Sequence, residues 1–90
     1  MKKFFVFIGL FSVITYAQIS YGDKIHVPYA HGNGYDAVVQ DIRGDRLLVK
    51  VIDVQLGYFT LLLKPSTCSG HEELQRGDRK IFWIPKYCVD

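Results

Sequence analysis

The chain of 90 residues contains little cysteine, no block of like charge and no apolar run long enough to span a bilayer. A transmembrane helix needs roughly 20 consecutive apolar residues, and the longest apolar run, at 4–14, reaches only about half of that length. Basic and acidic residues number 11 and 9, so no strong positive field attracts phosphate groups. These absences argue against a membrane-spanning protein and against nucleic-acid binding.

The N-terminal end has the three-part order of a secretory signal peptide. Lys2 and Lys3 precede the apolar run, and the small residue Ala17 follows it at the expected cleavage site. We expect 1–17 to be removed and 18–90 to be exported, periplasmic or secreted, with no stable membrane span. An uncleaved N-terminal anchor is the alternative. Cleavage also removes two lysines, which leaves nine basic and nine acidic residues.

Two cysteines, Cys68 and Cys88, are the only ones in the chain. An exported protein meets oxidising surroundings, so we expect a disulfide between them that stabilises a small core. Two free thiols, one of them reactive, are the alternative, because the sequence does not report the distance between the two Cα atoms.

The mature segment is expected to be one small all-β domain. Apolar, β-branched runs alternate with Gly-Asp pairs, which turn the chain because glycine accepts a positive φ and aspartate bonds nearby backbone. A two-residue turn at Gly44-Asp45 predicts a hairpin. Five strands are expected, at 24–29, 35–43, 46–54, 58–64 and 80–84, with single helical turns at 71–74 and 86–88. Closing such a sheet into an antiparallel barrel removes exposed edges.

Parts of this pattern resemble bacterial SH3-like and Tudor-like barrels. The similarity covers about half of the mature chain, and the segments that carry it are Gly22-Asp23-Lys24-Ile25-His26-Val27, Tyr35-Asp36-Ala37-Val38-Val39, 42–51 and Phe82-Trp83-Ile84-Pro85-Lys86. The segment 68–77 departs from the short connection of these folds. The resemblance implies a ligand groove lined by aromatic side chains, which selects Tyr29, Tyr35, Tyr58 and Trp83. The alternative is that some of these rings, Trp83 above all, complete the core.

No arrangement of residues in the sequence demands catalysis, a metal or another cofactor. The three histidines, His26, His31 and His71, lack the close pair typical of zinc ligands. A thiolate at Cys68 activated by His71 would need a reduced cysteine and an oxyanion hole. The tripeptides Arg43-Gly44-Asp45 and Arg76-Gly77-Asp78 spell an adhesion motif, but the same residues suit tight turns.

These observations predict an exported, non-enzymatic binding or structural module. Its partner would be a peptide, a cell-wall fragment or another protein. The alternative function is a small, disulfide-stapled inhibitor of an exported hydrolase, which would present a loop such as 68–77.

Overall fold

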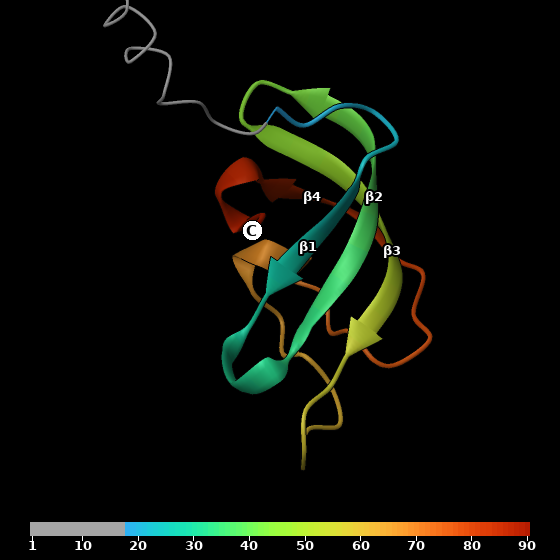
Figure 1. Ribbon diagram of the computed structural model, residues 1–90, viewed down its shortest axis with the longest axis vertical. Helices are drawn as coiled ribbons and strands as arrows, with labels where there is room; N and C mark the ends of the chain where they lie inside the picture. Colours follow the sequence, from blue (N-terminus) through green and yellow to red (C-terminus); the bar gives the residue numbers. More distant parts are fainter. Residues whose placement is uncertain (1–17) are drawn as a thin grey trace, which may run out of the picture.

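A computed structural model describes residues 18–90, so the predicted signal peptide lies outside the described residues. Four antiparallel strands form one sheet in the order β1-β2-β3-β4 (Figure 1). The strands are β1 (Lys24–Pro28), β2 (Gly34–Arg43), β3 (Arg46–Gln55) and β4 (Ile81–Pro85), and the helical turns are η2 (Ala30–Gly32), η3 (Thr67–Ser69) and η4 (Lys86–Cys88). The all-β prediction is confirmed. Within 18–90 there is no helix with the length and apolar character needed to cross a membrane.

Alternation along each strand puts one set of side chains into a core and the other set on the outer face. In β3, for example, Leu47, Val49 and Val51 are fully buried, whereas Leu48 and Lys50 between them are only half-buried. The buried set continues across the sheet with Ile25, Val27, Tyr35, Ala37, Val39, Val54, Phe82 and Ile84. Two residues outside the sheet, Leu63 and Leu74, pair as an isolated bridge and are also buried.

The β2–β3 hairpin forms as predicted, with Arg43 paired to Arg46 across the turn. Gly44 has a φ of 60°, and glycine at the first position of a two-residue turn is typical of the type II′ turn that matches strand twist. The register shifts between Asp36 and Ala37 and again between Val39 and Asp41. Such irregularities increase local twist and bend a sheet.

Two of the predicted elements are wrong. No strand forms at 58–64, because Phe59 has a φ of 64° and only Leu63 makes a bridge. The sheet therefore has four strands, where five were expected. The predicted helical turn at 71–74 is absent, and η3 forms earlier, where the Ser66 and Ser69 side chains make a capping box. The turn predicted at 86–88 is confirmed as η4.

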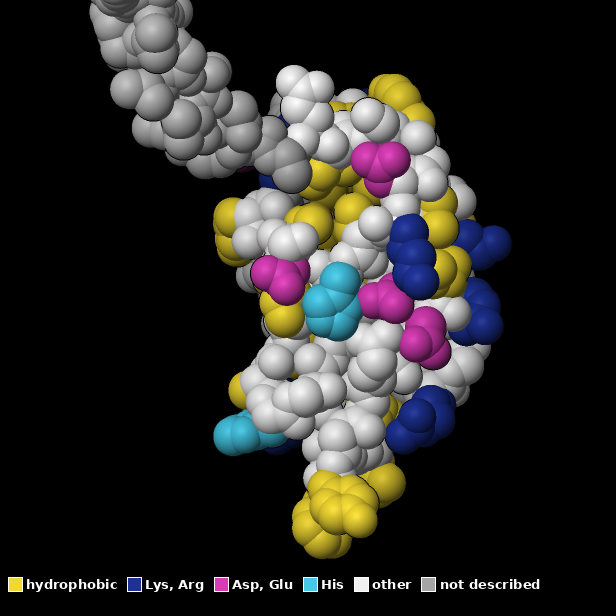
Figure 2. All heavy atoms as spheres, viewed as in Figure 1, with side chains coloured by type: hydrophobic (Ala, Val, Ile, Leu, Met, Phe, Trp, Pro, Cys, Tyr) yellow, Lys and Arg dark blue, Asp and Glu magenta, His cyan; other side chains and the backbone are white. Residues whose placement is uncertain are grey.

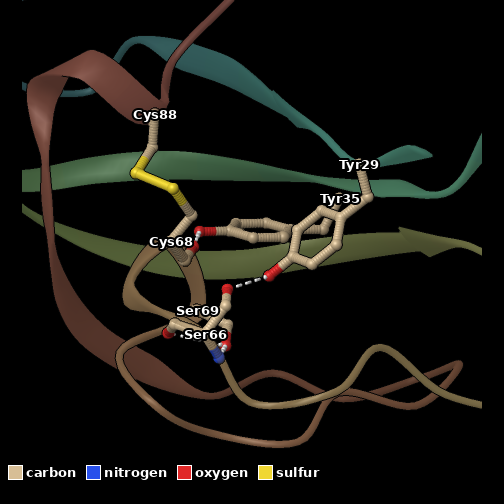
Figure 3. The surroundings of a disulfide bond; sticks show 6 residues. All are labelled: Tyr29, Tyr35, Ser66, Cys68, Ser69 and Cys88. Carbon is tan, nitrogen blue, oxygen red and sulfur yellow. Dashed lines mark hydrogen bonds between the residues drawn. A yellow bond between two sulfur atoms is a disulfide. The ribbon is translucent and has the colours of Figure 1, made fainter.

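A disulfide joins Cys68 in η3 to Cys88 in η4, with the two Cα atoms 5.6 Å apart (Figure 3). This confirms the predicted pairing, and no free cysteine remains among the described residues. The bond ties the chain after β4 to the long connection between β3 and β4. In the same region the Asp90 N–H donates to the His26 carbonyl of β1, 2.9 Å away, so the chain beyond η4 returns to the first strand.

Candidate functional site

The four aromatic residues selected from the sequence do not gather in one place. Tyr29 and Tyr35 form a tilted pair with ring centroids 6.4 Å apart, close to the disulfide (Figure 3). Tyr58 is in the connection after β3, and Trp83 is on the outer face of β4, paired with Leu48. The four rings therefore do not line one groove.

Tyr35 is a core residue. Its side chain is fully buried, and its ring makes an edge-to-face contact with Phe82 at a centroid distance of 5.9 Å. Its hydroxyl donates to the Cys68 carbonyl. Burial, with a smaller contribution from neighbouring Tyr29, raises the pKa of the Tyr35 phenol far above its usual value. This side chain supports the disulfide-bearing turn and offers no surface to a ligand.

Tyr29 has a similar supporting role beside it. Its hydroxyl shares a hydrogen bond of 2.9 Å with the Ser66 hydroxyl. Ser69, which is fully buried, donates through its hydroxyl to the Glu72 carbonyl at 2.7 Å and accepts from the Ser66 N–H at 3.0 Å. Figure 3 shows both tyrosine hydroxyls directed at this turn from the sheet. The polar ends of Tyr29 and Tyr35 are thus used to hold η3 in place.

The most exposed apolar surface is the loop that follows β3. Tyr58, Phe59 and Leu61 are 91%, 99% and 85% exposed, and we call these three residues the apolar tip. The connection after β3 extends beyond the sheet, and hydrophobic side chains gather at that end of the molecule (Figures 1 and 2). Burial of one such side chain stabilises a fold by about 1.5–3 kcal/mol. The three side chains of the apolar tip are exposed, so none of them contributes this stabilisation.

The base of the apolar tip is held by the turn between β1 and β2. The Gly57 N–H donates to Asn33 Oδ1 at 2.6 Å, and the Thr60 N–H donates to the Gly57 carbonyl at 3.2 Å. A Cβ on Gly57 would lie 2.7 Å from the His31 carbonyl oxygen, so glycine is required for this close approach. Above this anchored base, Phe59 adopts a φ of 64°, which costs a non-glycine residue about 1–2 kcal/mol.

A second surface feature lies at the other end of β3, beside the hairpin turn. Trp83, Arg43 and Arg46 line a shallow pocket of about 280 Å³. The Arg43 guanidinium is 5.6 Å from the centre of the Trp83 ring, a cation–π distance. The Asp41 carboxylate is 3.6 Å from Arg43 Nε.

The polar residues considered for catalysis or metal binding do not converge. Nδ1 of His26 is 2.7 Å from the Asp36 carboxylate, which Lys24 approaches to 3.9 Å. Within residues 18–90 no three histidine, cysteine, aspartate or glutamate side chains come together as metal ligands. Cys68 is in the disulfide, so it cannot act as a thiolate nucleophile paired with His71.

Protein-family models, curated proteins and solved structures give no match to the chain.

Four residues of these two surface features were not predicted as site residues from the sequence: Phe59, Leu61, Arg43 and Arg46. The run at 58–63 has the composition of a strand, because five of its six residues are aromatic or leucine. One signal pointed the other way: Gly57 precedes the run, and glycine after a strand often marks a close backbone approach. The sequence places Arg43 at the turn and Arg46 at the start of the next strand, but its spacing does not show that Trp83 lies beside them.

The segment 68–77, proposed as an inhibitory loop, is held against the body of the protein. The disulfide fixes its beginning, and the Leu63–Leu74 bridge fixes its middle. Its last turn forms as predicted at Arg76-Gly77-Asp78, where the Asp78 N–H donates to the Gln75 carbonyl at 3.0 Å. The protruding apolar loop is instead the apolar tip.

Proposed function

We propose that the mature chain is an exported, non-enzymatic binding module and that it docks a protein partner through the apolar tip. The observation that carries the proposal is the near-complete exposure of Tyr58, Phe59 and Leu61 on one anchored loop. Scattered single hydrophobic residues are normal on a protein surface, but contiguous ones mark interaction sites. Aromatic anchors such as tyrosine are enriched among the residues that dominate binding energy.

The anchored base makes this loop suitable for recognition. Because the Asn33 side chain and the Gly57 backbone fix where the loop begins, less conformational freedom is lost when a partner engages the tip. The left-handed Phe59 holds its side chain outward at an energetic cost. Residues with a strained backbone conformation are found mostly at functional sites, including the sites where proteins bind ligands. Burial of the Phe59 ring in an apolar pocket of the partner would offset the cost of this backbone conformation.

An SH3-like arrangement of the sheet is part of the same proposal. The resemblance implies a final strand that is followed by a short 3₁₀ turn. The sequence of η4 after β4 and the hydrogen bond from the Asp90 N–H to the His26 carbonyl support this arrangement. Export is supported by the predicted signal peptide at 1–17 and by the disulfide, because disulfides persist in oxidising compartments.

A photocrosslinking experiment tests the proposed partner. Benzoylphenylalanine is placed at position 59 of the full chain, and, as a matched control, at position 87, where Tyr87 is 77% exposed on η4. Illumination in the native cell envelope and medium should give a discrete protein adduct from position 59 and not from position 87. The absence of an adduct specific to position 59 would overturn the proposal.

Two substitutions then measure the contribution of the tip once the adduct is purified. Phe59→Asn should weaken binding by about tenfold or more, since central aromatic anchors contribute above 1.4 kcal/mol. Asparagine tolerates a positive φ, so the same change should leave the free energy of unfolding unchanged or slightly raised. Tyr87→Asn is the matched control and should bind like the native protein. Equal affinity of both variants would exclude the tip as the binding surface.

An inhibitor of an exported hydrolase remains the second candidate, with the apolar tip as the inserted loop in place of 68–77. The protrusion of a loop with a fixed base favours it, because such a loop fits a partner's cleft. If the adduct at position 59 contains a hydrolase, addition of the native protein should lower that enzyme's activity and Phe59→Asn should not. Unchanged hydrolase activity would leave a binding module without an inhibitory role.

A further inference from the structure

We propose that the pocket formed by Arg43, Arg46 and Trp83 binds a six-membered ring that carries one carboxylate. This is a second site, independent of the apolar tip. Arg46 begins β3, whereas the tip follows Gln55 at the end of the same strand. Ten residues of strand separate the two sites by roughly 30 Å along its path. The hairpin and the tip lie at opposite ends of the view in Figure 1.

The pocket combines a flat apolar wall with two guanidinium groups. The indole of Trp83 is only half-buried, and it lies on the outer face beside the half-buried Leu48. Arg43 and Arg46 face each other across the two-residue turn, both with exposed side chains. The β2–β3 hairpin and the pairing of β3 with β4 therefore fix the relative backbone positions of the three residues that line the pocket, which lowers the reorganisation needed before a ligand enters.

The charges of the pocket favour an anion. Asp41 approaches Arg43 at Nε and leaves the terminal nitrogens of that guanidinium without another ion pair among the described residues. Arg46 makes no ion pair within 18–90, although Asp45 is adjacent to it in the turn. Guanidinium groups present paired N–H donors that match the two oxygens of a carboxylate. The Arg43 guanidinium lies 5.6 Å from the centre of the indole, so one such donor set is held beside the apolar wall.

The pocket is shallow and open to solvent, and its size suits a ligand of about one ring. Its volume of about 280 Å³ lies just below the 300–1,000 Å³ typical of sites for drug-sized molecules. A ring laid against the indole would bury the apolar wall, and a carboxylate on that ring would reach the guanidinium groups. Both an acidic sugar and an aromatic acid have this chemistry. A simple anion lacks the ring, and a neutral sugar lacks the charge.

The single tryptophan of the chain gives a direct readout of the pocket. The full mature chain is titrated with galacturonate, benzoate, galactose and acetate while Trp83 fluorescence is followed. For a ligand of this size we expect saturable binding of galacturonate or benzoate with a Kd of about 1 mM. Acetate and galactose should bind at least tenfold more weakly. The ratio of galacturonate to benzoate affinity distinguishes an acidic sugar from an aromatic acid as the source of the ligand.

Arginine variants test the assignment of the donors. Arg43→Gln and Arg46→Gln should each weaken binding of the preferred ligand by about tenfold, the loss expected when one charge-assisted contact is removed. Arg79→Gln removes an exposed arginine elsewhere and should bind normally. Because the three side chains are exposed, all variants should fold, which their thermal midpoints verify. Equal binding of acetate, equal binding of galactose, or native affinity in both pocket variants would overturn the proposal.

Discussion

Reduction of the Cys68–Cys88 disulfide should destabilise the protein by about 3 kcal/mol. The bond closes a loop with a sequence separation of 20 residues, and the loss of chain entropy in the unfolded state gives this magnitude for a loop of that length. A folded segment of about seventy residues is typically stable by only about 4–11 kcal/mol. The disulfide therefore supplies a large share of the total.

Urea unfolding followed by Trp83 fluorescence, with and without a reductant, measures this difference. The denaturation midpoint should fall, and the slope of the free energy of unfolding against urea should rise, because the reduced unfolded chain exposes more surface. The Cys68→Ala/Cys88→Ala double variant should behave like the reduced protein, with an additional small loss where Cys88 leaves the core. Oxidised and reduced proteins that unfold within about 1 kcal/mol of each other would refute this argument.

Two further predictions concern the packing beneath the disulfide. Gly70→Ala should cost about 2–4 kcal/mol in thermal or urea unfolding, because a Cβ there would lie 2.6 Å from Phe82 Cβ and the φ of 60° is strained for alanine. Gly44→Ala has the same φ but open space around it, so its smaller loss isolates the backbone contribution. Burial raises the pKa of Tyr35, so the unfolded state loses its phenolic proton first as pH rises through about 10. Stability should then fall with pH in the native protein, and Tyr35→Phe should lack this component of the fall.

Local rules were sufficient to predict the elements in which alternation and turn chemistry agree. The runs at β2 and β3 alternate between buried and outer positions, and Gly44 permits the turn between them, so the hairpin follows from its own residues. The cysteine pair was predicted because only one pairing exists within the chain. In both cases no distant segment had to be known.

Local rules failed where distant contacts decide the conformation. The residues at 58–63 have the composition of a strand, but Gly57 is fixed against the turn between β1 and β2, and the chain leaves the sheet there. The resemblance to SH3-like and Tudor-like barrels predicts that Tyr29 and Tyr35 line a ligand groove. Their hydroxyls instead meet Ser66 and the Cys68 carbonyl, more than thirty residues away in the sequence. No local sequence pattern predicts these long-range hydrogen bonds.

A small domain can keep the exposed apolar tip because other residues hold the rest of the connection between β3 and β4 in place. Three large hydrophobic side chains lie outside the core and do not stabilise the fold. A fold of about seventy residues has only a small core, so this loss is large for it. The disulfide between η3 and η4 and the hydrogen bonds of the Tyr29 and Tyr35 hydroxyls stabilise another part of the connection without using those side chains. The three side chains of the apolar tip therefore take no part in the core. Its sequence can respond to the demands of a partner, and a strained Phe59 can persist there because the rest of the connection is fixed independently.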